Sequence, residues 1–432
     1  MTIAALQQLQ DDMKKCFRCS LCKMIPLPVI RDPRYADGCP ASRLYHVHGY
    51  SGSGKSIMAL SLLDGRIAAD EALARVAFAC TACGLCDVAC KFLMDAERHL
   101  INMALREHLA ESGFGLPAHG EAIENLRRLR QERPPSFSLS AWARSAGLGV
   151  WPEQKCRTLL LVGRDARDQA AAAATAAKLA RLLAGAGIEV GVLGDAEPDT
   201  GRAAYWSGHR ALFQTLARDF TRLLDDTPAS TVVVLSGCDF GMLRAKYPEV
   251  GSRPRARVLH AAQILDQLAK RGRLKPLRPL NRRVTYHDPC YLGRQSEPPV
   301  PWQGRHGTTH GCMTYTAPPR PVNRGVNGVF EEPRNLLRRI RGLTLAEMHR
   351  VREYAFCCGG GGGVPRAYPE LARSTALHRI DEARDTGAEV LVTACSLCRE
   401  TLAGAQASEP AGRRLPVVDL VDLLFEAAGL EL

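Results

Sequence analysis

Two groups of four cysteines near the start of the chain have the spacing of cluster ligands. Each group opens with three cysteines at steps of three residues, and a fourth follows: Cys16, Cys19, Cys22 and Cys39, then Cys80, Cys83, Cys86 and Cys90. A turn that carries thiolates at this step surrounds one corner of a [4Fe–4S] cubane, so the fourth ligand must come from farther along the chain. The array therefore predicts two [4Fe–4S] clusters.

Each fourth ligand is expected to cross to the other cluster, as in proteins that hold two such clusters. This prediction assigns Cys16, Cys19, Cys22 and Cys90 to one cluster, and Cys80, Cys83, Cys86 and Cys39 to the second. Zinc is the alternative, because C-x-x-C pairs also build tetrahedral sites, but those sites leave no role for a regular third cysteine. Two features depart from the usual pattern: the gap from Cys22 to Cys39 is long, and Lys91 stands where a proline often follows the last ligand.

The spacer between the two groups contains a match to the phosphate-binding loop pattern, from Gly49 to Ser56 with Lys55 at the lysine position. Alone, the match would indicate a nucleotide, and a nucleotide-dependent, redox-sensing assembly protein is the alternative function that it suggests. A phosphate loop requires a central parallel strand in an α/β core, which a short spacer between two cluster turns does not provide. A Gly/Ser turn that caps the next helix is the simpler interpretation.

A third group of cysteines occupies the last third of the chain. It consists of Cys290, the pair Cys357 and Cys358 followed by Gly359, and Cys395 with Cys398 at C-x-x-C spacing. With 16 cysteines and no export signal, the chain is expected to be cytosolic, where thiols stay reduced and clustered cysteines bind metals or do redox chemistry. Any membrane contact would come through a partner.

The composition is that of an ordinary globular protein of two or three domains. The 432 residues are 46% hydrophobic and 24% charged, which excludes a disordered chain, a collagen and a coiled coil. The net charge of +12 is spread over helical stretches without interleaved aromatic residues, so we expect a solvated basic surface and no nucleic-acid partner.

Helical periodicity dominates the first part of the chain, and strands appear after it. Residues 69–79, 95–112 and 119–131 predict helices, and the Pro-, Ser- and Gly-containing segment 132–151 predicts a linker. We expect a helical domain at 1–132, an α/β half at 155–275, and a second α/β half at 280–432 with an insertion at about 295–349.

The two α/β halves are expected to be an internal repeat. The first is predicted to hold a strand at 157–162, a helix at 168–183, and strands at 188–193 and 231–235; the second, strands at 284–287 and 389–392 and a helix at 370–385. Aligning Cys238 with Cys398 puts Asp199-Thr200-Gly201 opposite Cys357-Cys358-Gly359 and Leu235 opposite Cys395. The alignment therefore predicts that the first half is a copy of the second that has lost its cysteine motifs.

These residues carry a family resemblance over nearly the whole chain. Cys290, Cys357-Cys358-Gly359 and Cys395-x-x-Cys398 resemble the cysteine-rich CCG module of heterodisulfide reductases. The whole arrangement is similar to the D-type subunit of that family, to iron–sulfur subunits of glycolate and lactate oxidases, and to electron-transfer subunits of class II benzoyl-CoA reductases. The chain departs from the pattern in its degenerate first half and in the insertion at 295–349.

The resemblance implies a non-cubane iron–sulfur cluster held by Cys290, Cys357, Cys358, Cys395 and Cys398, which would also be the catalytic residues. Five thiolates exceed the four that a cubane takes, which agrees with an unusual cluster. The glycine run, with Gly359 and Gly360 at its start, is expected to let the backbone approach this cluster and offer amide N–H groups to it; a loop without such a role is the alternative.

Other groups near these motifs have open roles. His287 and Asp288 would supply protons to a substrate thiolate, or His287 would only orient a neighbouring ligand. Cys156 and Cys238 are interpreted as buried small hydrophobic residues, and Cys312 belongs to no motif.

The resulting functional hypothesis is an iron–sulfur oxidoreductase subunit of a multi-subunit complex. Electrons from a flavin-containing partner would pass through the two [4Fe–4S] clusters to the CCG-type cluster and there reduce a disulfide or another acceptor. A separate flavoprotein is implied because no G-x-G-x-x-G follows a strand. Further iron–sulfur subunits, or a membrane-associated partner linked to quinone, are additional candidates.

Overall fold

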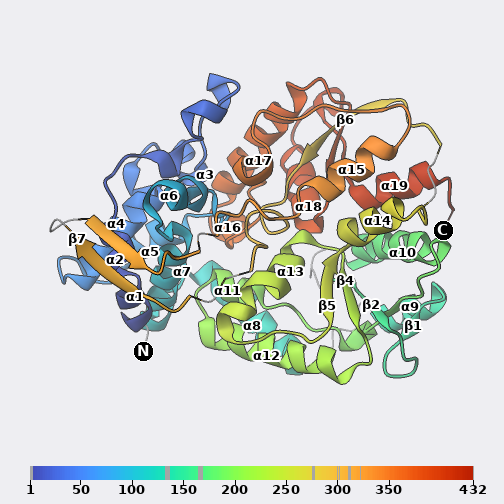
Figure 1. Ribbon diagram of the computed structural model, residues 1–432, viewed down its shortest axis with the longest axis horizontal. Helices are drawn as coiled ribbons and strands as arrows, with labels where there is room; N and C mark the ends of the chain where they lie inside the picture. Colours follow the sequence, from blue (N-terminus) through green and yellow to red (C-terminus); the bar gives the residue numbers. More distant parts are fainter. Residues whose placement is uncertain are drawn as a thin grey trace.

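The computed structural model describes residues 3–131, 137–163, 169–274, 278–298, 300, 302–309, 313–321 and 323–431. A mainly helical N-terminal part lies beside two α/β parts, each with its own parallel sheet (Figure 1). This arrangement confirms the predicted fold class. None of the described helices is long and apolar enough to cross a membrane.

The N-terminal part consists of short helices joined by the cysteine-bearing turns. Asp70 caps one of them by accepting a hydrogen bond from the Leu73 backbone N–H at 2.7 Å. Gly84, in the left-handed region at φ 72°, lies between Cys83 and Cys86 and directly precedes the next helix. The α-helices are α1 (Ile3–Gln8), α2 (Gln10–Lys14), α3 (Pro40–Tyr45), α4 (Gly52–Leu63), α5 (Glu71–Phe78), α6 (Leu85–Met94), α7 (Arg98–Leu109) and α8 (Pro117–Gln131).

The phosphate-loop match is a helix cap in the structure. The segment before it forms α3, where a nucleotide-binding core would have a strand. The Ser51 hydroxyl accepts a hydrogen bond from the Gly54 N–H and so caps α4. Lys55 is buried, and its ammonium donates to the Tyr50 carbonyl rather than facing solvent. The helix-cap interpretation therefore describes this segment, and the structure offers no phosphate cradle here.

The first α/β part is a five-stranded parallel sheet in the order β1-β3-β2-β4-β5. Its elements are α9 (Leu139–Ser145), β1 (Gly149–Val150), β2 (Thr158–Leu161), α10 (Gln169–Gly185), β3 (Gly191–Val192), α11 (Arg202–Trp206), α12 (Arg210–Asp226), β4 (Thr231–Val234), α13 (Gly237–Gly241), β5 (Arg257–His260) and α14 (Ala261–Lys270). The prediction of a linker at 132–151 is wrong for residues 137–151, because α9 and β1 lie there and belong to this unit. Residues 132–136 lie outside the described part.

The second α/β part is a four-stranded parallel sheet in the order β11-β10-β6-β9. Its elements are β6 (Arg282–His287), α15 (Glu331–Arg339), β9 (Leu343–Leu345), α16 (Val364–Ala367), α17 (Pro369–Arg384), β10 (Val390–Thr393), α18 (Ser396–Ala405), β11 (Val417–Asp419) and α19 (Leu420–Ala428). The order β9-β6-β10-β11 repeats the order β3-β2-β4-β5 of the first sheet, as the internal repeat predicts.

The predicted insertion at 295–349 extends too far toward the C-terminus. Its last part contains α15 and β9, which belong to the second α/β unit because β9 pairs with β6. The inserted segment proper forms an antiparallel hairpin of β7 (Arg305–Thr309) and β8 (Met313–Ala317). This hairpin reaches across to the N-terminal helices (Figure 1). Arg320 fixes it there through an ion pair with Asp95 at 3.0 Å.

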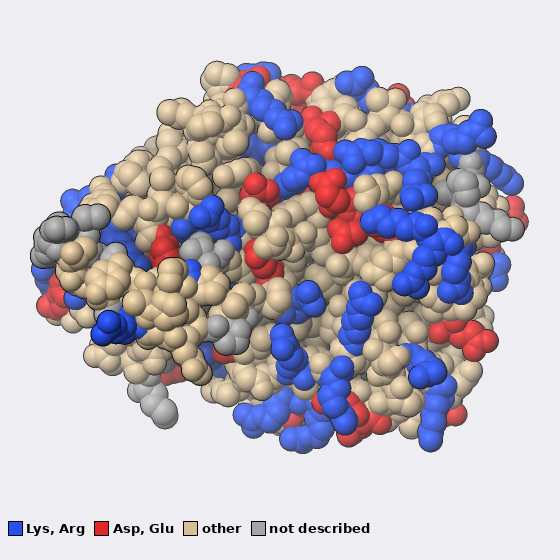
Figure 2. Space-filling model, in the orientation of Figure 1, with Lys and Arg blue, Asp and Glu red and all other residues tan. Residues whose placement is uncertain are grey.

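The basic residues are not all at the surface. On the face in Figure 2, Lys and Arg are scattered among Asp and Glu, which agrees with a solvated surface. Among the described residues, however, six arginines are almost fully buried. The prediction of a solvated basic surface did not foresee this burial of Arg98, Arg106, Arg294, Arg334, Arg350 and Arg379.

Arg106 on α7 joins the three parts of the molecule. Its guanidinium is fully buried and donates hydrogen bonds to five backbone carbonyls. These carbonyls belong to Ala77, Phe78 and Cys80 in the N-terminal part, Trp206 in the first α/β part, and Gly362 in the second. Since a guanidinium has five N–H donors, every donor is used.

Replacing Arg106 is expected to separate these parts. In Arg106→Met, five buried carbonyls lose their donor, and we expect a loss of at least about 3 kcal/mol in the free energy of unfolding, since one unsatisfied buried group alone costs about 1–3 kcal/mol. Arg106→Lys, with three donors, should be intermediate. Urea unfolding of anaerobically prepared protein measures the change.

The matched control is Arg222→Met, at an exposed position on α12, which should change stability by less than about 0.5 kcal/mol. Equal stability of the Arg106 and Arg222 variants would show that Arg106 does not hold the parts together.

Candidate functional site

The first four predicted ligands line a single small cavity. Cys16, Cys19 and Cys22 come from the turn after α2, and Cys90 comes from α6. The Ser53 backbone N–H, at the start of α4, donates to the Cys22 sulfur at 3.3 Å. Cys19 is exposed, so this cavity lies at the molecular surface.

The second four predicted ligands line a neighbouring cavity, formed by Cys39, Cys80, Cys83 and Cys86. Gly52 forms part of its wall, and a Cβ there would lie only 2.9 Å from the Cys86 Cβ. Burial raises the pKa of Cys39 to about 12. A neutral thiol suits this apolar pocket, whereas a thiolate requires a cation or metal beside it.

Arg98 borders both cavities, and it fits the presence of an anionic group there. Its Nε donates to the Cys90 sulfur at 3.0 Å. Its Nη1 and Nη2 are buried and have no hydrogen-bond partner within the described part of the chain. An iron–sulfur cluster carries sulfur acceptors and negative charge, so the residues present fit such a group.

The third cysteine group gathers where parallel strands end, which is where ligands bind in open α/β sheets. Cys290 follows β6, and Cys395 follows β10 and precedes α18. Hydrogen bonds between thiols connect Cys290 to Cys357, Cys357 to Cys358, Cys358 to Cys398, and Cys398 to Cys395. The structure thus brings all five predicted residues together.

These contacts lower the pKa of some of the thiols and raise the pKa of others. Hydrogen bonds from Cys357 and Cys398 lower the pKa of Cys358 well below its usual range, and those from Cys238 and Cys398 do the same for Cys395. The hydrogen bond with Cys357 and burial raise the pKa of Cys290. A buried group that favours thiolates in this way suits metal ligation.

The glycine run lies tightly against both the thiols and the N-terminal part. The Gly359 and Gly360 N–H groups donate to the sulfurs of Cys357 and Cys358 at 3.3 and 3.4 Å. Gly359 has φ 91°, a left-handed value that favours glycine. A Cβ on Gly362 would lie 2.1 Å from the Cys80 carbonyl oxygen, so only glycine permits this approach.

His287 is held in one orientation. The Arg379 Nε donates to its Nδ1 at 3.1 Å, so the neutral ring carries its proton on Nε2. That Nε2 has no partner among the described residues, and one nitrogen of the ring lies within 4.8 Å of the Cys358 and Cys398 sulfurs. Burial, then the charge of Arg379, lowers the pKa of His287 to about 3. The geometry favours the orienting role over proton supply.

Asp288 has a structural partner. Its carboxylate accepts two hydrogen bonds from the buried Arg334 guanidinium at 2.7 and 2.9 Å, and a third from the Arg352 N–H. Burial would raise the pKa of Asp288, but the hydrogen bonds and charge of Arg334 outweigh it and lower the pKa. The aspartate therefore remains charged and anchors the loop after β6.

Cys83 connects the N-terminal cysteines to the third group. Its thiol is hydrogen-bonded to Cys357, and its carbonyl accepts from the buried Arg294 at 2.7 Å. Arg294 also donates to the carbonyls of Glu353 and Ala355, just before Cys357. One turn therefore belongs both to the second N-terminal cavity and to the edge of the third cysteine group.

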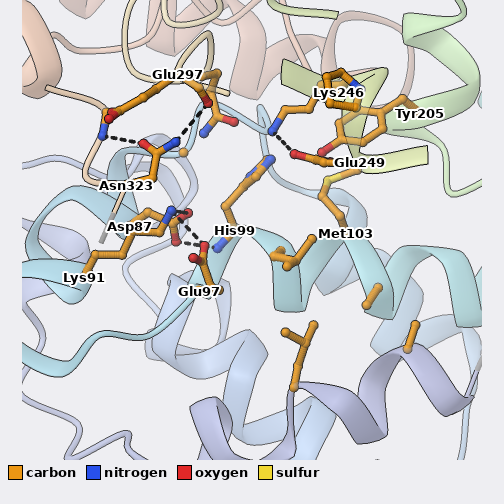
Figure 3. Close-up of a pocket in the computed structure, with 18 of the residues that line it drawn as sticks. Asp87, Lys91, Glu97, His99, Met103, Tyr205, Lys246, Glu249, Glu297 and Asn323 are labelled. Atoms are coloured by element: carbon orange, nitrogen blue, oxygen red, sulfur yellow. Dashed lines mark hydrogen bonds and ion pairs between the residues drawn. The ribbon is translucent and has the colours of Figure 1, made fainter. Parts of the chain in front are cut away.

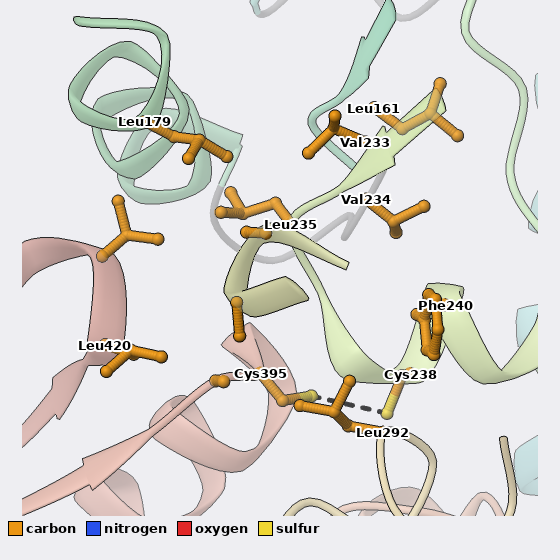
Figure 4. Packing of buried hydrophobic residues seen from close by; sticks show 14 of the residues in the cluster. Leu161, Leu179, Val233, Val234, Leu235, Cys238, Phe240, Leu292, Cys395 and Leu420 are labelled. Carbon is orange, nitrogen blue, oxygen red and sulfur yellow. Dashed lines mark hydrogen bonds between the residues drawn. The ribbon is translucent and has the colours of Figure 1, made fainter. Parts of the chain in front are cut away.

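Cys238 also belongs to this third group. It is buried, as predicted, but its sulfur lies 3.6 Å from the Cys395 sulfur, and Ser236 is 3.7 Å from the same sulfur (Figure 4). The prediction that Cys238 is buried is therefore confirmed, and the structure adds a thiol neighbour that the prediction did not include. Its place opposite Cys398 in the internal repeat was the signal available in the sequence. Cys156 is only half-buried, and Cys312 lies outside the described residues.

The first α/β half has hydrogen-bonded polar groups where its repeat partner has thiols. The Asp199 carboxylate accepts from the Gly201 N–H at 2.7 Å, in the same two-residue pattern as Cys357 and Gly359. The Thr200 hydroxyl donates to Asp239 at 2.7 Å. The two halves therefore share the hydrogen-bonded turn, with polar side chains in the first half and thiols in the second.

Comparisons with known proteins agree with these motifs. The 4Fe-4S dicluster domain family matches residues 12–93, and the cysteine-rich domain (CCG) family matches residues 310–403. Over 81% of its length, the chain is 30% identical to the D-type subunit of the dihydromethanophenazine:CoB–CoM heterodisulfide reductase of Methanosarcina acetivorans, of which it covers 78%. The chain belongs to the family of D-type heterodisulfide reductase subunits.

As a member of the D-type heterodisulfide reductase family, the chain is an iron–sulfur oxidoreductase subunit. It is also 28% identical to the EtfAB:quinone oxidoreductase of Syntrophomonas wolfei, over 58% of this chain and 31% of that protein. A hypothetical protein from Helicobacter pylori shares the fold, with a TM-score of 0.51 and 9% identity over 100% of this chain and 77% of that one.

Replacing Cys238 tests its place in the third cysteine group. We expect Cys238→Ser to change the electron paramagnetic resonance signal of a cluster held by the CCG cysteines, because the neighbour of the Cys395 sulfur changes. The N-terminal signals should stay as they are. Cys156→Ser, at a half-buried cysteine outside all three groups, is the control and should alter neither signal. If the spectra of Cys238→Ser and Cys156→Ser are identical, Cys238 has no influence on the cluster and is only a hydrophobic core residue.

Proposed function

We propose that this subunit carries electrons from a flavoprotein partner through two [4Fe–4S] clusters to a CCG-type cluster. The first cluster would be held by Cys16, Cys19, Cys22 and Cys90; the second by Cys39, Cys80, Cys83 and Cys86; and the third, a non-cubane cluster, by Cys290, Cys357, Cys358, Cys395 and Cys398. These clusters supply one-electron redox chemistry when bound.

The contact between Cys83 and Cys357 carries this proposal. It places a predicted ligand of the second cluster against a predicted ligand of the third, with no intervening residue. Cys39 and Cys90, the predicted fourth ligands, lie in cavities that share Arg98 as a wall. The residues thus form a continuous path from Cys19 at the surface to Cys395 in the core.

Electrons are proposed to arrive at the surface end of this path. Cys19 is exposed, and the apolar side chains of Phe17 and Leu93 beside it are 78% and 50% exposed. Large exposed apolar residues beside a redox site are typical of a protein contact. The name of the Syntrophomonas relative, EtfAB:quinone oxidoreductase, supports a flavoprotein as the donor to be tested first.

The reaction proposed at the inner end is disulfide reduction, RS–SR + 2 e⁻ + 2 H⁺ → 2 RSH. The His287 ring would lie beside Cys358 and Cys398 as a neutral group that does not release a proton, because burial keeps the ring neutral. Arg379 fixes the ring, and the Gly359 and Gly360 N–H groups stabilise thiolate charge. The name of the Syntrophomonas relative favours a quinone as the second candidate acceptor, which would use the same path.

Iron analysis with Cys358→Ser tests the assignment of the third cluster. Anaerobically prepared protein is expected to contain about 12 iron atoms per chain, as two cubanes and one further four-iron cluster require. Cys358→Ser should lose about four of these, because a central thiolate of the CCG group is missing. The N-terminal clusters should still be reduced by dithionite, while electron delivery to a disulfide acceptor stops.

Cys156→Ser, the same replacement at a cysteine outside all three groups, is the matched control and should keep both iron and activity. An iron content near eight that Cys358→Ser does not lower would show that the CCG site holds no cluster. Unimpaired turnover in Cys358→Ser would move the acceptor site elsewhere.

A further inference from the structure

A cavity of about 710 Å³ lies where three segments meet, and the proposed relay uses none of its side chains. The lining comes from α1, α6 and α7 of the N-terminal part, from the region around α11 and residues 246–249 of the first α/β half, and from residues 294–297 and 323–325 of the second half. Figure 3 shows the His99 ring and the Lys246–Glu249 pair directed into this space from different elements. Its volume is that of a site for a small organic molecule.

Four polar atoms that have no hydrogen-bond partner among the described residues lie on residues lining this cavity: His99 Nε2, Tyr205 Oη, Arg294 Nη2 and Glu297 Oε2. His99, Tyr205 and Arg294 are only 5%, 9% and 6% exposed. Buried polar groups are nearly always paired in native proteins, so several unpaired ones at one cavity indicate a missing occupant. Three of the four can donate a hydrogen bond.

The charges around the cavity favour an anionic occupant. Its carboxylates already have cationic or amide partners, such as Lys91 for Glu97 at 2.8 Å and Lys246 for Glu249 at 2.8 Å. Arg294 donates only to backbone carbonyls. Arg324 lies over the Phe92 ring at 4.6 Å. Neither arginine is paired with a carboxylate within the part of the chain that the structure describes. Arg294 also lies near the thiols of Cys83, Cys290 and Cys357, but its Nη2 is left without a hydrogen-bond partner there.

The rest of the lining is apolar. Leu100 and Met103 of α7, Phe213 of α12 and Pro248 all line the cavity. Such a wall accommodates a hydrocarbon or aromatic body, because burying apolar surface is favourable. The site therefore combines an anion-binding end with an apolar end.

We propose that this cavity binds a small organic carboxylate with an apolar body. The carboxylate oxygens accept hydrogen bonds from Arg294 and Tyr205 near the charge of Arg324, and the body packs on Met103 and Phe213. Gln295 and Gly84 both line the cavity and lie against each other, since a Cβ on Gly84 would lie 1.5 Å from the Gln295 Nε2. The bound molecule would thus sit beside the turn that carries Cys83, and the proposal stands independently of the electron relay.

Isothermal titration calorimetry on the anaerobic holoprotein tests the proposal with hexanoate and 4-phenylbutyrate, each paired with the alcohol of the same skeleton. We expect at least one acid to bind saturably, one molecule per chain, and about tenfold more tightly than its alcohol, because the alcohol lacks the charge-assisted hydrogen bonds. Tyr205→Phe and Arg324→Gln should each weaken the acid about fivefold or more and leave the alcohol unchanged.

Tyr286→Phe is the matched control, since it also removes a buried hydroxyl without a partner, at a position outside the cavity. The iron content of each variant shows that it has folded. Equal affinity of acids and alcohols, no saturable binding of either acid to the wild-type protein, or unchanged affinity in both variants with wild-type iron content would overturn the proposal. An ordered-water cavity would give the second of these outcomes.

Discussion

The buried guanidinium of Arg106 is the interaction on which the rest of the structure depends. Its five hydrogen bonds end on three separate parts of the chain, including the Cys80 carbonyl on the second cysteine turn and the Gly362 carbonyl in the glycine run. A guanidinium satisfies all these acceptors only if the parts meet at one point. That requirement holds the N-terminal cysteines against the CCG cysteines, where Cys83 reaches Cys357.

Two other buried arginines also donate hydrogen bonds to separate parts of the molecule at this interface. Arg294 donates to the carbonyl of Cys83 on one side and to that of Ala355 on the other. Arg350 joins the Asp37 carbonyl of the N-terminal part to Glu382 of α17. Because buried cations require nearby acceptors or negative charge, these residues also suit a centre that holds anionic clusters. A small part of the positive charge in the sequence is therefore structural.

Local patterns in the sequence predicted the elements whose signal is local. Apolar runs located β2, β4, β6 and β10, and the cysteine spacings located both N-terminal cavities. β1 was not predicted, because the residues on either side of it have the composition of a linker. β9 was not predicted, because only its pairing with β6 distinguishes it from the insertion. Contacts between distant segments have no local signal, so the roles of Arg98 and Arg106 appeared only in the folded chain. The carboxylate cavity was missed for the same reason.

In the proposed relay, the second N-terminal cluster and the CCG cluster lie in direct succession through Cys83 and Cys357. Electron paramagnetic resonance of the dithionite-reduced holoprotein is the decisive measurement of this arrangement, because paramagnetic centres in close succession couple magnetically. We expect broadened or split signals that simplify when Cys358→Ser removes the CCG cluster. Two independent sets of signals, identical in the wild-type protein and the variant, would contradict it.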